Sequence, residues 1–282
     1  MIASINKTKE ILSKYDLYAK KGFGQNFLID SNIIDKIINS ANVSKMTGVI
    51  EIGPGLGALT EKLCMNAKKV LCYEIDEDMV EVLKGELSFD NLKIQNVDFL
   101  KANLEEDFSY FDDCERVIVA SNLPYYITTP IIFKLLESNL NIDSMYFIVQ
   151  KEVALRLTGK PNTKDYNSLS VLINYKADAR LLFNVGRNCF LPSPDVESAI
   201  IMLSRIKSDY TPNNEAKFLD FIRNLFSMRR KTVLNNISSK YPINKDLIRE
   251  SLAKANLKES VRAEELDLNK IIELYQLFGF DK

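Results

Sequence analysis

The segment GVIEIGPGLG, residues 48–57, joins an apolar run to a glycine-rich turn. Its first five residues have the composition of a buried strand, and glycines follow at 53, 55 and 57. A glycine-rich turn between a parallel strand and a helix lets a ligand approach the backbone closely. The segment therefore predicts a strand over 48–52 and a helix over 56–65, joined by a ligand-binding turn.

Strand and helix patterns alternate on both sides of this segment. Alternation at this spacing is typical of βαβ units, so it predicts an α/β, Rossmann-like sheet that is mostly parallel, with helices on both faces. The last two strands are expected to form an antiparallel edge. The expected strands are 48–52, 69–74, 92–97, 116–120, 144–149, 180–185 and 197–203, and the expected helices include 29–45, 56–65, 77–87, 130–137 and one that begins at 168.

A polar break at 206–214 divides the chain. Beyond it the pattern is purely helical, which indicates a small α-helical domain. We therefore expect a catalytic domain over 1–206 and a helical domain over 207–282.

Composition narrows the function classes. The chain has 46% hydrophobic and 27% charged residues, which is ordinary for a soluble protein. Its apolar runs are shorter than the roughly 20 residues of a membrane helix, and the first residues lack the apolar core of a signal peptide, so we expect a cytoplasmic protein. The four cysteines form no CxxC pair and histidine is absent, so no metal site is expected.

The spacing of the glycines favours a ligand other than a dinucleotide. The chain has G-x-G-x-G in place of G-x-G-x-x-G, and Pro54 removes an amide that would hold a phosphate. S-adenosylmethionine, which has no pyrophosphate, fits this turn, with Gly53 and Gly55 beside it. Glu74 ends the second strand, where such folds place the carboxylate that binds ribose hydroxyls. Asp98, after the third strand, is placed to accept from the adenine amine.

The segment SNLPYYITTP, residues 121–130, follows the fourth strand. It has no group that titrates near neutrality, and methyl transfer from a sulfonium requires none, because the cofactor supplies the activated carbon. The side-chain oxygen of Asn122 and the carbonyl of Pro124 could accept from an adenine amine and stabilise the positive charge that develops on it. Tyr125 could stack on the base. The catalytic role of this segment is thus to orient a weak nucleophile.

At these residues the chain resembles the ribosomal RNA adenine dimethyltransferases, and within them the bacterial KsgA/RsmA group that acts on small-subunit (16S) rRNA. The resemblance covers nearly the whole chain. The segments that carry it are KGFGQNFL (21–28), EIGPGLGALT (51–60), NLPYYITTPI (122–131), VQKEVALRL (149–157), KDYNSLS (164–170) and FLPSPDVESA (190–199). A family loop often rich in glycine is TGKPNTKDYN here.

The resemblance implies further roles. Asn26 and Leu28 would contact the cofactor, as would Asn122, and Phe190 would be the second aromatic ring around the target base. The implied reaction is N6,N6-dimethylation of two adjacent adenosines in a hairpin loop near the 3′ end of small-subunit rRNA, a late step in assembly of the subunit. The implied partner is this rRNA or a pre-30S particle, with no DNA and no membrane, and a monomer suffices.

Charge is distributed unevenly. Residues 1–28 and 206–282 are each net positive by three, whereas 29–205 are net negative by seven. We expect the helical tail to contact RNA phosphates through Arg223, Arg229, Arg230 and Lys231, with Lys20 and Lys21 as weaker candidates.

Three alternatives remain open at this point. The same chemistry could act on large-subunit rRNA, as in the erythromycin-resistance methyltransferases, or on DNA adenine. The chain could be a non-catalytic RNA-binding assembly factor, although the intact Asn122, Tyr125 and Gly53 argue against that. An NAD-dependent oxidoreductase is disfavoured by the glycine spacing and by the lack of histidine.

Overall fold

The computed structural model describes residues 1–19 and 25–281; the candidates Lys20 and Lys21 and the start of the KGFGQNFL segment lie outside them. The chain divides into two compact units. Met1–Ala154 and Arg180–Arg205 form the first, and Leu155–Ala179 and Ile206–Lys282 form the second. The boundary predicted at residue 206 lies where the chain passes from the first unit into the second for the last time. It did not anticipate that residues 155–179 belong with the helical tail.

Within the described residues, seven strands form one sheet in the order β4-β3-β2-β5-β6-β9-β7. Pairing is parallel from β4 through β6, whereas β9 pairs antiparallel with β6. The expected parallel sheet with an antiparallel edge is therefore confirmed. The strands are β2 (Thr47–Ile52), β3 (Lys69–Glu74), β4 (Leu92–Asn96), β5 (Arg116–Asn122), β6 (Ile142–Gln150), β7 (Ala177–Val185) and β9 (Ser198–Arg205).

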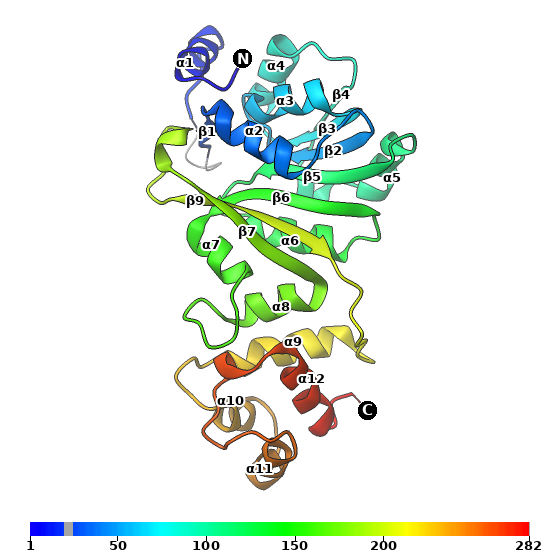
Figure 1. The fold of residues 1–282 in the computed structure, drawn as a ribbon, viewed down its shortest axis with the longest axis vertical. Coiled ribbons are helices and arrows are strands. Elements are labelled where there is room, and N and C mark those ends of the chain that lie inside the picture. Colours follow the sequence, from blue (N-terminus) through cyan, green and yellow to red (C-terminus); the bar gives the residue numbers. More distant parts are fainter. Residues whose placement is uncertain (20–24, 282) are drawn as a thin grey trace. The chain divides into compact units, whose positions relative to one another are not determined.

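Helices cover both faces of this sheet (Figure 1). On one face α2, α3 and α4 pack with α1, and their apolar side chains form a common core with β2, β3 and β5. The other face carries α6, which is tied to β9 through Arg205, a donor to the carbonyl oxygens of Leu135 and Leu140. The bounds are α1 (Ile5–Lys14), α2 (Ser31–Ser40), α3 (Ala58–Asn66), α4 (Glu77–Glu86), α5 (Leu104–Phe108) and α6 (Thr128–Glu137).

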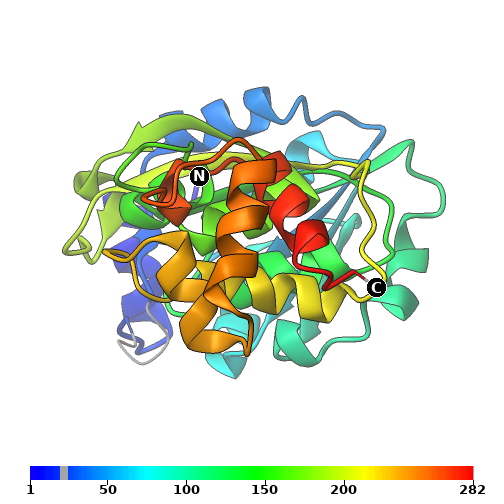
Figure 2. The same ribbon diagram turned by 90° about the horizontal axis from the view of Figure 1, so that it is seen from below.

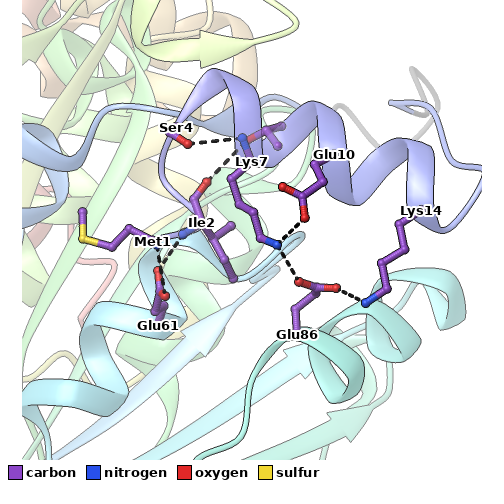
Figure 3. A network of polar contacts seen from close by, with 9 residues as sticks. Met1, Ile2, Ser4, Lys7, Glu10, Lys14, Glu61 and Glu86 are labelled. Carbon is purple, nitrogen blue, oxygen red and sulfur yellow. Dashed lines mark hydrogen bonds and ion pairs between the residues drawn. The ribbon is translucent and has the colours of Figure 1, made fainter.

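The helix α1 was not expected from the sequence. Its apolar side, with Ile11 fully buried, packs on the core, and two acidic residues from other helices hold it. The backbone N–H of Ile2 donates to Oε2 of Glu61 on α3 at 2.7 Å. Lys7 and Lys14 place their Nζ atoms 3.4 Å and 2.6 Å from the carboxylate of Glu86, at the end of α4 (Figure 3).

The second unit has an aromatic core. Phe218 of α9 lies edge-on to Tyr175 of α8 at 5.2 Å and to Tyr275 of α12 at 5.0 Å between ring centroids. Tyr166 donates its hydroxyl to the carbonyl of Leu266 at 2.7 Å. These contacts explain why residues 155–179 join the tail. The helices are α7 (Lys151–Leu157), which spans the boundary, then α8 (Ser168–Lys176), α9 (Glu215–Leu225), α10 (Val233–Lys240), α11 (Lys245–Lys254) and α12 (Leu268–Leu277). Figure 2 shows α9 to α12, yellow to red, as one group.

No described helix combines the length and the apolar character needed to cross a membrane.

Replacing Glu86 with glutamine should destabilise the first unit. Hydrogen bonds from Lys14 and Lys7 lower the pKa of the Glu86 carboxyl, so its contribution is complete above the ordinary glutamate pKa of about 4.3 and is lost as pH falls through the lowered value. At pH 7, Glu86→Gln should lower the Tm by on the order of 2 °C, and the difference should vanish in acid. Glu10→Gln, which removes the other partner of Lys7, is the control and should have a smaller effect. Equal melting of wild type and Glu86→Gln at pH 7 would contradict the role of this cluster.

Candidate active site

The carboxyl ends of five parallel strands meet at one edge of the sheet. Ile52 pairs with Tyr73, Glu74 with Asn96, and Asn122 with Ile148, so β2 to β6 end nearly level. Parallel pairing places everything that follows these strands at the same edge, which is where α/β folds bind ligands. Gly53, Asp98 and Leu123 therefore lie beside one another although they are distant in sequence.

A cavity of about 250 Å³ opens at this edge, within the first unit. All seven residues predicted to bind the cofactor line it, together with Pro124 and Tyr125. Other residues that line it include Ile2, Thr8, Ile75, Phe99 and Leu100, none of which belongs to a sequence motif singled out above, and Tyr126 from the segment after the fourth predicted strand. Over the described residues, no cluster of histidine, cysteine, aspartate and glutamate could hold a metal ion.

The glycine turn at the floor of the cavity is held by Glu74. Gly53 and Gly55 adopt left-handed backbone conformations, with φ of +66° and +56°, which other residues adopt only with strain. One carboxylate oxygen of Glu74 accepts from the N–H of Gly55 at 3.1 Å and the other from the N–H of Asp76 at 3.0 Å. Burial raises the pKa of the Glu74 carboxyl, and these two backbone donors oppose the shift.

Glu51 is a buried carboxyl at the start of the EIGPGLGALT segment, two residues before Gly53. Its side chain lines the cavity and is 1% exposed. Cys72 Sγ lies 3.6 Å from its Oε2 as a donor. Burial, with a smaller contribution from the nearby Glu74 carboxylate, raises the pKa of Glu51 to about 8. A group of this kind is neutral at pH 7 and can bind a cationic ligand only by losing its proton.

Asp98 caps the short helix that follows β4. Its Oδ1 accepts from the N–H of Leu100 at 3.0 Å, and Lys101 lies 4.0 Å from Oδ2. The cap fixes the carboxylate at the wall of the cavity. Its second oxygen points away from the capped N–H, so the group keeps a hydrogen-bond acceptor for a ligand.

The amide of Asn122 is oriented by the N-terminal segment. Asn26 precedes the short strand β1 (Phe27–Leu28), which pairs antiparallel with β8 (Phe190–Leu191). Asn122 Nδ2 donates to the backbone oxygen of Asn26 at 3.0 Å. This bond fixes which end of the amide is the nitrogen, so the oxygen Oδ1 is the end that can accept from a substrate.

The turn after Asn122 is closed by its own proline. The carbonyl of Pro124 accepts from the N–H of Ile127 at 3.2 Å and from the hydroxyl of Thr128 at 3.1 Å. Tyr125 is anchored separately, because its hydroxyl lies 2.8 Å from Oγ of the buried Ser198 at the start of β9. The Tyr125 ring is thus held at a fixed angle at the cavity wall.

The structure places Phe190 in the core of the first unit. The resemblance implied that its ring faces the target base, but it is 2% exposed and belongs to the apolar core beneath β1. It pairs with Leu28 in the β1–β8 ladder and is not among the residues that line the cavity. Because the ring is packed in the core, this arrangement does not offer it for stacking.

The predicted RNA-binding residues lie in the second unit and are exposed. Arg223 is on α9, whereas Arg229, Arg230 and Lys231 occupy the turn before α10. Arg229 is already engaged, since Nε lies 3.4 Å from Glu264 and NH2 donates to the carbonyl of Lys164.

The family model for ribosomal RNA adenine dimethylase matches residues 17–278. The chain belongs to this family. A Bacillus pumilus protein called ribosomal RNA small subunit methyltransferase A is 44% identical, over 97% of this chain and 96% of its own length. Its Bacillus licheniformis counterpart is 43% identical with the same coverage.

Two solved structures have a similar fold. A dimethyladenosine transferase from Plasmodium falciparum is similar with a TM-score of 0.74 and 28% identity, covering 90% of this chain and 98% of that protein. The 23S rRNA methyltransferase ErmE follows with a TM-score of 0.66 and 26% identity, over 90% of this chain and all of ErmE. The Rossmann-like methyltransferase fold expected from the sequence is thereby confirmed.

Glu51→Gln should change how stability depends on pH. A carboxyl whose pKa is raised on folding stabilises the protein fully below its unfolded pKa, near 4.3, and loses this contribution as pH rises through about 8. Glutamine does not titrate, so the variant should gain stability relative to wild type between pH 5 and pH 9. Urea unfolding at both pH values tests this, with Glu105→Gln, an exposed glutamate on α5, as control. A difference independent of pH would show that Glu51 is not buried as a neutral acid.

Proposed function

We propose that this chain transfers methyl groups from S-adenosylmethionine to the N6 amines of two adjacent adenosines in small-subunit rRNA. The observation that carries the proposal is the oriented Asn122 amide at the wall of a cavity that also holds Glu74 and Asp98. Membership of the adenine dimethylase family and the 44% identity to a small-subunit methyltransferase support it.

The residues of the cavity fit the proposed cofactor. The left-handed glycines at 53 and 55 leave room for close approach to the backbone, where a Cβ at 55 would lie 3.4 Å from the Phe27 ring. Glu74 and Asp98 offer carboxylate oxygens to the ribose hydroxyls and the adenine amine. The apolar side chains of Ile75 and Leu123 add the surface that a purine needs.

When bound, S-adenosylmethionine supplies a methyl carbon activated by its sulfonium. The contribution of the protein is to position the amine and stabilise its developing positive charge. Asn122 Oδ1, held by the bond from Nδ2 to Asn26, accepts one amine hydrogen and draws the nitrogen lone pair toward the methyl group. A second transfer requires the monomethylated amine to rotate and present its remaining hydrogen to the same oxygen.

The target base would stack on Tyr125, whose ring is fixed by Ser198. Stacking contributes about 1–3 kcal/mol per base, which offsets much of the few kcal/mol needed to extrude a loop adenosine. The carbonyl of Pro124 already receives two intramolecular donors. It can accept from the amine only by sharing or releasing one of them, so Asn122 is the principal acceptor.

The second unit would contact rRNA phosphates through Arg223, Arg230 and Lys231, with Arg229 contributing beside its ion pair to Glu264. The proposed partner is small-subunit rRNA or its pre-30S particle, in the cytoplasm. A monomer is sufficient, because one chain supplies all residues of the cavity.

The substrate can be identified by incubating the protein with labelled methyl donor and small- and large-subunit RNAs side by side, and mapping modified bases by mass spectrometry. We expect dimethylated adenosine at two adjacent loop positions of the small-subunit RNA. Methylation of only the large-subunit RNA would favour the ErmE-like alternative, and binding without methylation would favour an assembly factor.

Asn122→Ala should lower kcat by on the order of 10²–10³-fold, because it removes the acceptor that stabilises the charged amine. The Kd for S-adenosylhomocysteine, measured by calorimetry, should change much less. Asn39→Ala, an exposed asparagine on α2, is the matched control. Methylation by Asn122→Ala at the wild-type rate would remove this mechanism.

Arg230→Glu should make rRNA binding less dependent on salt. Each phosphate contact contributes about 0.7–0.9 to the slope of log K against log salt concentration, so the slope should become shallower by about that amount. Arg230 is preferred to Arg229 because Arg229 also holds the loop at Lys164. Lys84→Glu, the same charge reversal at an exposed residue of α4, should leave the slope unchanged. Identical slopes for the two variants would exclude the turn of Arg229, Arg230 and Lys231 from the interface with rRNA.

A further inference from the structure

The turn after β5 carries a second tyrosine that the proposed mechanism does not use. Tyr126 lines the cavity, yet its side chain is 57% exposed. Most large apolar and aromatic side chains near it are buried, including Leu123 at 2% and Phe99 at 4% exposure. An exposed aromatic ring at the mouth of a ligand cavity has surface to cover when a ligand arrives.

The two tyrosines of the closed turn have different surroundings. Both hydrogen bonds to the Pro124 carbonyl come from the residues that start α6, so the backbone between them is fixed. Tyr125 is tied to Ser198 on β9, and β9 lies beyond β6 on one side of β5. Glu74 and Asp98 follow β3 and β4, which lie on the other side of β5.

Tyr126 lies on the side of Glu74 and Asp98. It lines the same cavity as both carboxylates, and in keeping with this, partial burial and the charges of Asp98 and Glu74 raise the pKa of its phenol. The same part of the cavity is walled by Ile75, Phe99 and Leu100. Apolar walls with a carboxylate between them are suited to a purine that carries an amine.

We propose that Tyr126 covers the adenosine half of the methyl donor and determines how tightly that half is held. The inference rests on the proposed function, because it takes Glu74 and Asp98 as the adenosine-binding carboxylates. The ring packs against the purine from the open side of the cavity, opposite the floor formed by the glycine turn. The donor and its demethylated product share the adenosine, so Tyr126 contributes equally to the affinity for both.

A role for Tyr126 as the second ring around the target base is the competing assignment, since Phe190 is buried. The geometry disfavours it. Two rings that enclose one base must face each other, whereas the Tyr125 hydroxyl is tied to β9 and Tyr126 lines the cavity together with Glu74 and Asp98 at the ends of β3 and β4. The two assignments differ in which ligand loses affinity when the ring is removed.

Calorimetry with two probes tests the inference. Tyr126→Ala should raise the Kd of both S-adenosylhomocysteine and 5′-methylthioadenosine by about tenfold, the loss expected for one stacked ring. Because methylthioadenosine lacks the amino-acid tail, an equal factor for the two probes assigns the contact to the adenosine half. Tyr126→Phe keeps the ring and should bind within about twofold of wild type. The KM for rRNA should not change in either variant at saturating donor.

Unchanged affinity of Tyr126→Ala for both probes would overturn the inference, and a raised KM for rRNA with unchanged probe binding would assign the ring to the target base instead. Failure of the proposed function is a separate result, because wild-type protein would then bind neither probe. Circular dichroism shows whether Tyr126→Ala is folded. If it is not, the variant Tyr126→Trp, described next, is used in its place.

The chain contains no tryptophan, so Tyr126→Trp introduces a single indole at the mouth of the cavity. Its emission should shift to shorter wavelength and change in intensity when either probe binds, because the exposed ring becomes covered. Met46→Trp, at a 44% exposed residue just before β2 and thus at the opposite end of the sheet, is the control and should not respond. An unchanged Tyr126→Trp spectrum, in a protein shown by calorimetry to bind the probe, would contradict the inference.

Discussion

Parallel pairing of β4, β3, β2 and β5 is the constraint on which this site depends. Parallel strands in register end at one edge, so residues separated by more than twenty positions become neighbours. The glycine turn after β2 lies at this edge, where the cavity opens. Glu74 then joins two strand ends by accepting from Gly55 and Asp76. One carboxylate thereby shapes the turn and remains at the wall of the cavity.

The turn after β5 places an amide and two tyrosines at the wall of one cavity. Its proline carbonyl is satisfied internally, which makes the turn rigid without help from a substrate. Rigidity lets Asn122 present an oriented oxygen, and it separates the two tyrosines that follow. In such an arrangement catalysis needs no titrating group, because positioning and a fixed acceptor are sufficient for a nucleophile facing an activated methyl carbon.

The second unit is assembled from two stretches of chain. Residues 155–179 leave the sheet region, pack their aromatic side chains against α9 and α12, and the chain then returns to complete the sheet. Tyr166 adds a buried hydrogen bond to the backbone at Leu266. A domain built in this way is stabilised by contacts distant in sequence, so the helical tail alone lacks part of its own core.

The sequence by itself determined the alternation of strands and helices, the glycine turn and the residues at the strand ends, because local periodicity and motif spacing encode them. It also carried the family resemblance. Only the tertiary structure decided that helix α1 packs beside the cavity, where its Thr8 forms part of the lining together with Ile2. The same is true of the burial of Glu51 and Phe190 and of the membership of 155–179 in the second unit. These depend on which faces pack together and how much water they exclude. Side-chain burial is set by partners distant in the chain, and no local pattern records them.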